Sequence, residues 1–273
     1  MSTIGIIGAG SIGLLIASYL SEQHEVTVYT RQTEDRDVRI IRDGTASQPV
    51  EVRPLDQFES QDLVFVTTKS YDIKSVIPYL MTETAPVLFL QNGMGHVTQV
   101  EQVPHALFGI VEHGAMRTGK YEVRHTGVGR IRYGQAFLPM LEDGPLQFEH
   151  VEDIQSVMLT KLFMNAVINP LTAYHRITNG QLLEEPYASK AHALFEELRH
   201  VFPQHDISYA EIEQVMQRTG LNRSSMLQDI EQGRRTEIDP IVGYVLERAV
   251  TPTPLLTFYF EQITSQEKRG DSM

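Results

Sequence analysis

Three glycines near the amino terminus constrain the fold more than any other feature of this sequence. Gly8, Gly10 and Gly13 interrupt the stretch TIGIIGAGSIGLLIASYL, which is otherwise mostly apolar. The residues before Gly8 are typical of a buried strand, and those after Gly10 have the composition of a helix. Glycine permits a turn that other residues cannot make. The sequence therefore predicts a strand, a tight turn and a helix that packs closely on that strand.

The first half of the chain repeats this alternation of apolar strands and helical stretches. Nearly continuous apolar runs occupy residues 3–8, 25–30, 62–68, 86–91 and 106–111. Such runs suit strands that are covered on both faces, and their alternation with helices is typical of a parallel sheet. Residues 121–134 (YEVRHTGVGRIRYG) are expected to form two short strands around a glycine-containing turn.

Helical periodicity replaces the strand pattern from about Val151 onward. Helices are predicted over 152–168, 186–201, 208–218, 225–232, 237–250 and 255–266. We therefore expect an α/β domain of the Rossmann type over residues 1–151 and an all-α domain over residues 152–273.

Charge and composition exclude several classes of function. The net charge of −12 disfavours nucleic acid and anionic membrane as partners, since both reward a basic surface. The chain has no cysteine, which removes disulfides, thiolate nucleophiles and cysteine-bound metal, and its ten histidines lack the H-E-x-x-H spacing, so we expect no metal. Residues 4–20 are apolar enough to resemble a signal peptide, but no Lys or Arg precedes them and glycines recur through them. No other run reaches the roughly 20 apolar residues of a membrane helix. We expect a cytoplasmic protein.

The glycines have the G-x-G-x-x-G spacing between a strand and a helix. There, the second glycine lets a pyrophosphate approach the backbone, and the helix amino terminus supplies N–H groups. The second strand runs into Arg31, where NAD-selective sites place Asp or Glu. Because a guanidinium can pair with a 2′-phosphate, we predict NADP(H) as the cofactor. The alternatives are a glycine turn without a ligand and an ordinary surface arginine.

Two further strands also run into polar residues. Lys69 follows the third strand, and Asn92 follows the fourth. Ligands of open α/β sheets bind outside the carboxyl ends of the strands, so these residues are candidates for the same site.

A polar row interrupts the apolar helix predicted near residue 160. Lys161, Asn165 and Asn169 are spaced four residues apart, so they share one face. Buried ammonium and amide groups need partners, and we infer that this row faces a cleft and a substrate. Pro170 should kink the helix directly after it. The alternative is that Lys161 reaches solvent and the asparagines bond other backbone groups.

The stretch NRSSMLQDIEQGRRTEID (222–239) has a local structural interpretation. Ser225 with Gln228 fits a helix capping box, and Thr236 with Asp239 fits the start of the next helix. Glu237 would then be a first-turn carboxylate. The pattern alone favours this interpretation.

Together, these segments resemble the ketopantoate reductases (2-dehydropantoate 2-reductases). The resemblance spans almost the whole chain and is most specific in KLFMNAVINPLTA and SSMLQDIEQGRRTEID. It implies a Rossmann-like domain and a helical domain like that of 6-phosphogluconate dehydrogenase. It also implies NADPH-dependent reduction of ketopantoate to (R)-pantoate, a step of pantothenate and coenzyme A biosynthesis.

The resemblance also implies roles for individual residues. It makes Lys161 the general acid and Glu237 a catalytic carboxylate beside cofactor and substrate. The implied cofactor-binding residues are Gly8, Ala9, Gly10, Ser11, Ile12, Gly13, Arg31, Lys69, Asn92, Ala115 and Glu237. The implied substrate-binding residues are Asn92, Asn165, Asn169, Asn179, Asn222 and Ser225.

Two other functions remain open at this stage. One is a related reductase of another small 2-oxo acid. The other is a non-catalytic NADP-binding regulator, which would need the glycines and Arg31 but not Lys161 or Glu237. A monomer and a homodimer are both compatible with the sequence.

Overall fold

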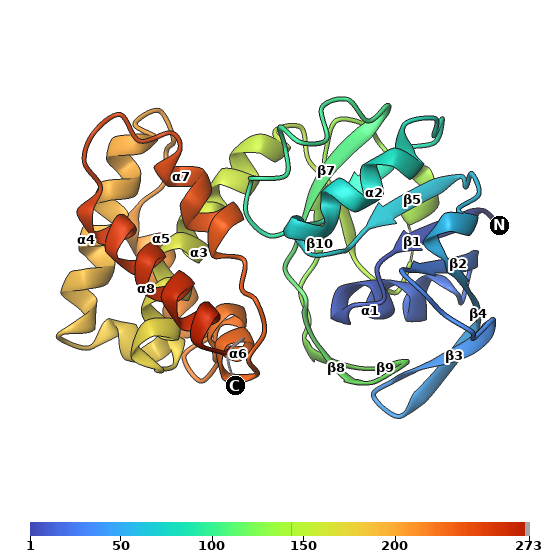
Figure 1. Ribbon diagram of the computed structural model, residues 1–273, viewed down its shortest axis with the longest axis horizontal. Coiled ribbons are helices and arrows are strands. Elements are labelled where there is room, and N and C mark those ends of the chain that lie inside the picture. Colours follow the sequence, from blue (N-terminus) through green and yellow to red (C-terminus); the bar gives the residue numbers. More distant parts are fainter. Residues whose placement is uncertain (143, 271–273) are drawn as a thin grey trace. The chain divides into compact units, whose positions relative to one another are not determined.

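The computed structural model describes residues 1–142 and 144–270. The chain forms two compact units, an α/β unit and a helical unit (Figure 1). The first contains residues 1–91 and 96–154, and the second contains residues 92–95 and the chain from Gln155 onward. The expected combination of an α/β unit and an all-α unit is confirmed. The predicted division after residue 151 assigns residues 92–95 to the first unit, whereas their contacts assign them to the second.

The α/β unit is built on one sheet of eleven strands. These are β1 (Thr3–Ile7), β2 (Glu25–Thr30), β3 (Asp37–Arg42), β4 (Thr45–Pro54), β5 (Leu63–Val66), β6 (Val87–Phe89), β7 (Ala106–Val111), β8 (Gly114–Gly119), β9 (Glu122–Gly127), β10 (Ile131–Tyr133) and β11 (Phe148–His150). The strand order is β11-β10-β7-β6-β5-β1-β2-β4-β3-β9-β8.

The centre of the sheet follows the sequence pattern closely. Strands β7, β6, β5, β1, β2 and β4 are parallel neighbours. Ile4 and Ile6 of β1 are fully buried, as are Val64 and Phe65 of β5. Their burial explains the continuous apolar runs, because a central parallel strand is covered on both faces.

The edges of the sheet differ from the expected parallel arrangement. β3 and β4 form an antiparallel hairpin, and β8 and β9 form another, so the sheet is mixed. Residues 121–134 contain two strands as predicted, but β9 pairs with β8 and β3, whereas β10 pairs with β7 and β11. The reason is local: only Lys120 and Tyr121 separate β8 from β9, and a two-residue connection favours pairing of the adjacent strands.

Helix α1 (Ser11–Leu20) is enclosed by the sheet, and contacts β2, β3, β4, β8 and β9 (Figure 1). Consequently, Leu14, Leu15, Ile16 and Ala17 are all buried, although they point in different directions around the helix. The second α-helix of this unit is α2 (Ile73–Leu80). The enclosure of α1 explains why its sequence is apolar enough to resemble a targeting segment.

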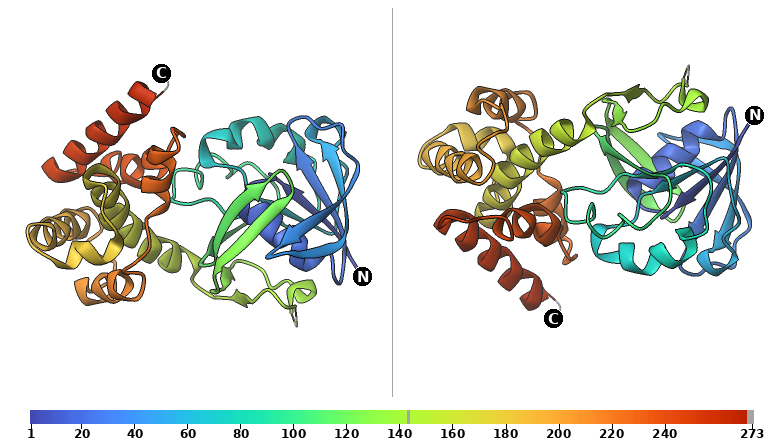
Figure 2. Two further views of the ribbon diagram at one scale, coloured as in Figure 1. Left: turned by 90° about the horizontal axis from the view of Figure 1, so that it is seen from below. Right: turned by 90° about the horizontal axis from the view of Figure 1, so that it is seen from above.

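The second unit contains helices and loops over its described residues (Figure 2). Its helices are α3 (Ile154–His175), η4 (Asn179–Leu183), α4 (Tyr187–Val201), α5 (Tyr209–Arg218), α6 (Ser225–Glu231), η5 (Asp239–Gly243, a π-helix), α7 (Tyr244–Leu246) and α8 (Pro254–Gly270). Helix α3 continues through Pro170 to His175 and so extends beyond the predicted end at residue 168. Among the described residues, no helix combines the length and the apolar character needed to span a bilayer.

Candidate functional site

The glycine turn joins three central strands of the sheet. Gly8 follows β1 with φ of +117°, and its N–H donates to the carbonyl of Tyr29 at 2.9 Å. Its own carbonyl accepts a hydrogen bond from Thr67 Oγ1, after β5, also at 2.9 Å. A Cβ on Gly13 would lie 1.9 Å from the Gly8 carbonyl oxygen, so α1 approaches the turn as closely as backbone atoms allow. The backbone conformation at Gly8 and the closeness of the Gly8 carbonyl at Gly13 therefore exclude a side chain at either position.

At Gly10, by contrast, the protein's own geometry does not require a glycine. It is the exposed N-cap of α1, with φ of −78° and ψ of −176°, an extended conformation open to any residue. Apart from its chain neighbours Ala9 and Ser11, no residue that the structure describes has a heavy atom within 4 Å of the position that its Cβ would take. The first N–H groups of a helix have no partner within the helix and attract anions. Open space beside Gly10 and the amino terminus of α1 together fit the pyrophosphate of a dinucleotide.

The β8–β9 hairpin brings two predicted cofactor residues into one region. The backbone N–H of Arg117, in β8, donates to Ser11 Oγ at 3.1 Å, at the start of α1. Ala115 lies two residues earlier and packs against the apolar core of this unit. Ser11 and Ala115 are 104 positions apart in the sequence, yet the hairpin holds them near the same helix terminus.

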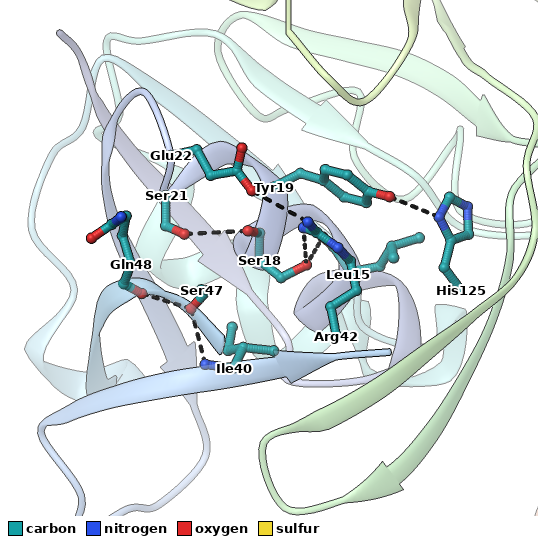
Figure 3. A network of polar contacts seen from close by, with 10 residues as sticks. All are labelled: Leu15, Ser18, Tyr19, Ser21, Glu22, Ile40, Arg42, Ser47, Gln48 and His125. Atoms are coloured by element: carbon teal, nitrogen blue, oxygen red, sulfur yellow. Dashed lines mark hydrogen bonds and ion pairs between the residues drawn. The ribbon is translucent and has the colours of Figure 1, made fainter. Parts of the chain in front are cut away.

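A polar network attaches the inner face of this hairpin to α1 (Figure 3). The Tyr19 hydroxyl lies 3.0 Å from His125 Nδ1, which comes from β9. The Arg42 guanidinium stacks on the Tyr19 ring, 3.5 Å from its centroid, and donates to Ser18 Oγ and Glu22 Oε1 at 3.2 Å each. The network links α1 to β3 and β9 at the carboxyl end of α1, opposite the end that faces the candidate anion site.

The network continues from His125 to His113. The Gly129 N–H donates to His113 Nδ1 at 3.1 Å, so that nitrogen is an acceptor. His125 Nε2, 3.0 Å from the same nitrogen, must then carry a proton and donate it. His113 can take this place only when it is neutral. Burial, with a smaller contribution from His125, lowers the pKa of His113 to about 4.

This arrangement predicts that the fold weakens in mild acid. Burial also lowers the pKa of His96 to about 4, and both of its ring nitrogens are buried without a hydrogen-bond partner among the described residues. In unfolded chains histidine titrates near pH 6.5, so the unfolded state binds more protons between about pH 6.5 and 4. The stabilisation is complete above pH 6.5 and is lost as the pH falls toward 4. Each histidine should remove about 1.4 kcal/mol per pH unit from the unfolding free energy, as urea titrations at several pH values would show.

His113→Asn provides the matched control, because the Asn Oδ1 can accept the same hydrogen bonds and does not titrate. Below pH 6.5 the unfolding free energy of the variant should depend less on pH than that of the wild type. Between pH 7 and 8 the two proteins should show the same pH dependence. An unfolding free energy that is equal at pH 5 and pH 7 in the wild type would contradict the assignment.

The residues after β2 and β5 lie on either side of the glycine turn. Arg31 follows β2 directly, its side chain is 74% exposed, and it forms an ion pair with Asp72. Lys69, after β5, is the N-cap of the short helix η2 (Ser70–Asp72) and is partly buried. Both predicted residues therefore lie at the carboxyl edge of the sheet, and Asp72 joins them there.

Gln91 also acts at this edge, although it was not among the predicted site residues. Its Nε2 donates to the carbonyls of Val66 and Thr68 at 2.9 and 3.1 Å. The amide thereby fixes the end of β6 to the end of β5, directly before Asn92. The sequence signal was present in the Gln91-Asn92-Gly93 run, but it did not separate the structural amide from its neighbour.

In the helical unit, the polar row lies on α3 as predicted. Lys161 and Asn165 are partly exposed, whereas Asn169 is 6% exposed. One turn beyond, Thr172 Oγ1 donates to Ser224 Oγ at 2.7 Å. This bond ties the end of the row to the start of α6.

The start of α6 differs by one residue from the prediction. Ser224, not Ser225, is the N-cap, and its Oγ accepts from the Leu227 N–H at 3.1 Å. Gln228 does not close a capping box with Ser225, since its Nε2 donates to the Arg223 carbonyl. The buried hydroxyl of Ser224 can accept from both Thr172 and Leu227, which selects it over its neighbour. Ser225 is left exposed in the first turn of α6.

Two of the predicted asparagines meet at the end of α5. The Asn179 N–H donates to the Asn222 carbonyl at 3.0 Å, and Asn179 Nδ2 donates to Thr219 Oγ1 at 2.9 Å. Asn179 is 8% exposed, and its Oδ1 has no hydrogen-bond partner among the described residues. Asn222 is exposed. The structure thus leaves one buried acceptor at Asn179 for another group.

Asn92 and Glu237 form a direct hydrogen bond across 145 positions of sequence. Asn92 Nδ2 donates to Glu237 Oε2 at 3.0 Å, and Glu237 is 5% exposed. The following segment docks on Pro240: the Met94 N–H donates to its carbonyl at 3.0 Å, and a Cβ on Gly93 would lie 2.2 Å from that oxygen. These contacts explain why residues 92–95 belong to the helical unit.

A second carboxylate fixes the turn that carries Glu237. Glu267 Oε1, in α8, accepts from both the N–H and the Oγ1 of Thr236, at 2.7 and 2.5 Å. Thr236 Oγ1 in turn accepts from the Ile238 N–H at 3.2 Å. Asp239 does not close the predicted capping box with Thr236, because its carboxylate pairs with Arg235. Glu237 therefore extends from a turn held on both sides, and only Ile238 separates it from the π-helix η5.

The fold and these residues define a class of protein. An α/β unit with a glycine turn that fits a pyrophosphate, joined to a helical unit with a lysine, amides and a buried carboxylate, is the arrangement of a nicotinamide-dependent oxidoreductase.

Comparison with known proteins specifies the family. A family model described as ketopantoate reductase PanE/ApbA matches residues 4–136, and the model of its C-terminal part matches residues 153–267. The 2-dehydropantoate 2-reductase of Bacillus subtilis (strain 168) is 36% identical, over 90% of each chain. The chain belongs to the ketopantoate reductase family, and it is an oxidoreductase of the type that acts on CH–OH groups.

Solved structures agree with this assignment. The crystal structure of a probable 2-dehydropantoate 2-reductase from Bacillus subtilis has a TM-score of 0.86 at 34% identity, and the match covers 97% of this chain and 99% of that one. A ternary structure of D-mandelate dehydrogenase with NADH and anilino(oxo)acetate has a TM-score of 0.88 at 20% identity, covering 98% and 99% of the two chains. At that identity the second comparison establishes a common fold only.

Proposed function

We propose that this protein reduces ketopantoate to (R)-pantoate with NADPH, in the cytoplasm, as a step of pantothenate and coenzyme A biosynthesis. The observation that carries the proposal is the set of polar groups retained in the helical unit. The row on α3 and the bond between Asn92 and Glu237 occur in a chain that is 36% identical to a 2-dehydropantoate 2-reductase. A regulator that only bound NADP would not require these groups.

The α/β unit supplies the residues that would hold the cofactor. The turn from Gly8 to Gly13 and Ser11 of α1 would bind the pyrophosphate, with Ala115 beside them on β8. Arg31 and Lys69 would bind the 2′-phosphate and the adenosine end. The D-mandelate dehydrogenase structure contains NADH, so the shared fold also accommodates a cofactor without that phosphate. Preference for NADP must therefore come from side chains such as Arg31.

The helical unit supplies the residues that would act on the substrate. When bound, NADPH provides the hydride for the ketone carbon. The Lys161 ammonium polarises the ketone oxygen and donates the proton that makes it a hydroxyl. Asn165 and Asn169 hold substrate oxygens one and two turns along α3. Glu237 fixes the Asn92 amide through their hydrogen bond, and both residues would contact the cofactor, with Asn92 also contacting the substrate.

The remaining predicted residues would bind the distal part of the substrate. Asn179 Oδ1, a buried acceptor without a partner among the described residues, suits a substrate hydroxyl. Asn222, joined to Asn179 through its carbonyl, and Ser225, exposed at the start of α6, complete this group.

Turnover of a substrate panel tests the proposal. The loss of NADPH absorbance is followed with ketopantoate and with 2-oxo acids that have smaller, larger or aromatic side chains. We expect the highest kcat/KM for ketopantoate. A higher kcat/KM for another 2-oxo acid would identify a reductase of different specificity, and tight NADPH binding without turnover would identify a regulator.

Substitution of Arg31 tests the choice of cofactor. Hydrogen bonds to a charged group contribute about 1.5–3 kcal/mol, so Arg31→Ala should weaken NADPH binding about tenfold or more. NADH affinity should change little, because NADH lacks the 2′-phosphate. The dissociation constants are measured by the fluorescence of the reduced nicotinamide, and an equal loss for both cofactors would contradict the role of Arg31.

A further inference from the structure

An ion pair joins residues that follow the two neighbours of β1: Arg31 comes directly after β2, and Asp72 lies in η2, the short helix after β5. In the sheet, β1 lies between β2 and β5, and Ile7 is level with Tyr29 on one side and with Val66 on the other. Arg31 leaves β2 just beyond this level, and Asp72 follows β5 after six residues. The two flanking strands are about 10 Å apart, and the Arg31 and Asp72 side chains meet between them. The Arg31–Asp72 pair therefore lies at the carboxyl edge of the sheet beside the glycine turn.

This position sets Asp72 in competition with the proposed cofactor. The Arg31 guanidinium is the group expected to pair with the 2′-phosphate of NADP, and in the structure it pairs with the Asp72 carboxylate instead. A 2′-phosphate must displace that carboxylate and then lie near its negative charge. The ribose hydroxyls of NAD carry no charge, and a carboxylate is the group that accepts them in NAD-selective sites.

We propose that Asp72 is a specificity-determining residue that opposes Arg31, lowering the preference for NADP over NAD. The inference rests on the proposed function, because it assumes that Arg31 binds the 2′-phosphate. The Asp72 carboxylate stays paired with the guanidinium until a phosphate displaces it. Because the Arg31 side chain is largely exposed, solvent screens the pair and a phosphate can displace it, so the effect is graded and not absolute.

A structural role does not account for this carboxylate. Asp72 is the N-cap of α2, but its side chain makes no capping hydrogen bond there. The contact of Ser75 Oγ with this residue is to its backbone carbonyl, which any residue would supply. Asp72→Asn therefore keeps the shape and the capping capacity of the side chain and removes only the charge.

The test compares dissociation constants for NADPH and NADH in the wild type and in Asp72→Asn. We expect the variant to bind NADPH about fivefold more tightly, with no gain for NADH. Glu25→Gln is the matched control, since it removes one negative charge from the opposite end of β2, at an exposed position. The control should leave the ratio of the two constants unchanged, and thermal melting should show that both variants are folded.

The mechanism is tested in the Arg31→Ala background. There, Asp72→Asn should improve NADPH binding by less than about twofold, because no guanidinium remains to be released. An equal gain in both backgrounds, a gain shared by Glu25→Gln, or an unchanged NADPH-to-NADH ratio in Asp72→Asn would each overturn the role of Asp72. A wild-type chain that binds neither dinucleotide would instead overturn the proposed function, and this inference with it.

Discussion

Lys161→Ala is expected to lower kcat for ketopantoate reduction by about 10²-fold or more. The ammonium is the proposed proton donor, and alanine can neither polarise the ketone oxygen nor protonate it. NADPH affinity should be retained, because the residues proposed to hold the cofactor's phosphates belong to the other unit. Steady-state kinetics give kcat, and NADPH fluorescence gives the dissociation constant.

Two companion variants separate the possible roles of this lysine. Lys161→Arg keeps the positive charge, but a guanidinium is a far weaker acid, so kcat should stay low if proton donation is the function. Lys190→Ala removes a lysine from α4 of the same unit and should leave kcat unchanged. Near-normal turnover in Lys161→Ala would remove Lys161 from the role of general acid.

Alanine at Gly13 and alanine at Gly10 should have opposite effects on folding and binding. At Gly13 the new Cβ would lie 1.9 Å from the Gly8 carbonyl oxygen and 2.6 Å from Thr67 Oγ1. Relief of that overlap requires α1 to move away from β1, and we expect the unfolding free energy to fall by about 3 kcal/mol or more. Urea unfolding followed by circular dichroism measures this loss.

At Gly10 the backbone conformation is open to alanine, and among the described residues other than its chain neighbours the Cβ would meet no heavy atom within 4 Å. The unfolding free energy should therefore change by less than about 0.5 kcal/mol. NADPH affinity should nevertheless fall by about tenfold or more, since the methyl group would occupy the space left for the pyrophosphate. The chain contains no tryptophan, so nicotinamide fluorescence is the suitable probe. Unimpaired NADPH binding in Gly10→Ala would show that the pyrophosphate does not approach this residue.

The sequence predicted the elements whose environment is uniform. Central strands such as β1 and β5 are buried on both faces, and their composition reports this directly. Strands β3 and β4 were missed because they are partly exposed and carry charged residues, including Arg39 and Glu51. A strand at such an edge is selected by pairing with its neighbours, and a local pattern does not record that pairing.

The candidate site shows the same contrast between local and distant information. The row containing Lys161 was visible because its spacing matches one helix face. The N-cap of α6 is Ser224 and not the predicted Ser225, and this choice depends on Thr172, which is 52 positions away from Ser224. The link from Glu267 to Thr236, across 31 positions, left no recognisable spacing either. Residues that position others through tertiary hydrogen bonds were therefore beyond the reach of the sequence.

The assignment of residues 92–95 to the helical unit has a consequence for recombination between relatives. A chimaera cut once, near residue 152, would combine Asn92 from one parent with Glu237 and Pro240 from the other. The hydrogen bond between Asn92 and Glu237 would then join residues from different parents, and so would the close contact of Gly93 with Pro240. Functional exchange of the helical half therefore requires that this four-residue segment be transferred together with it.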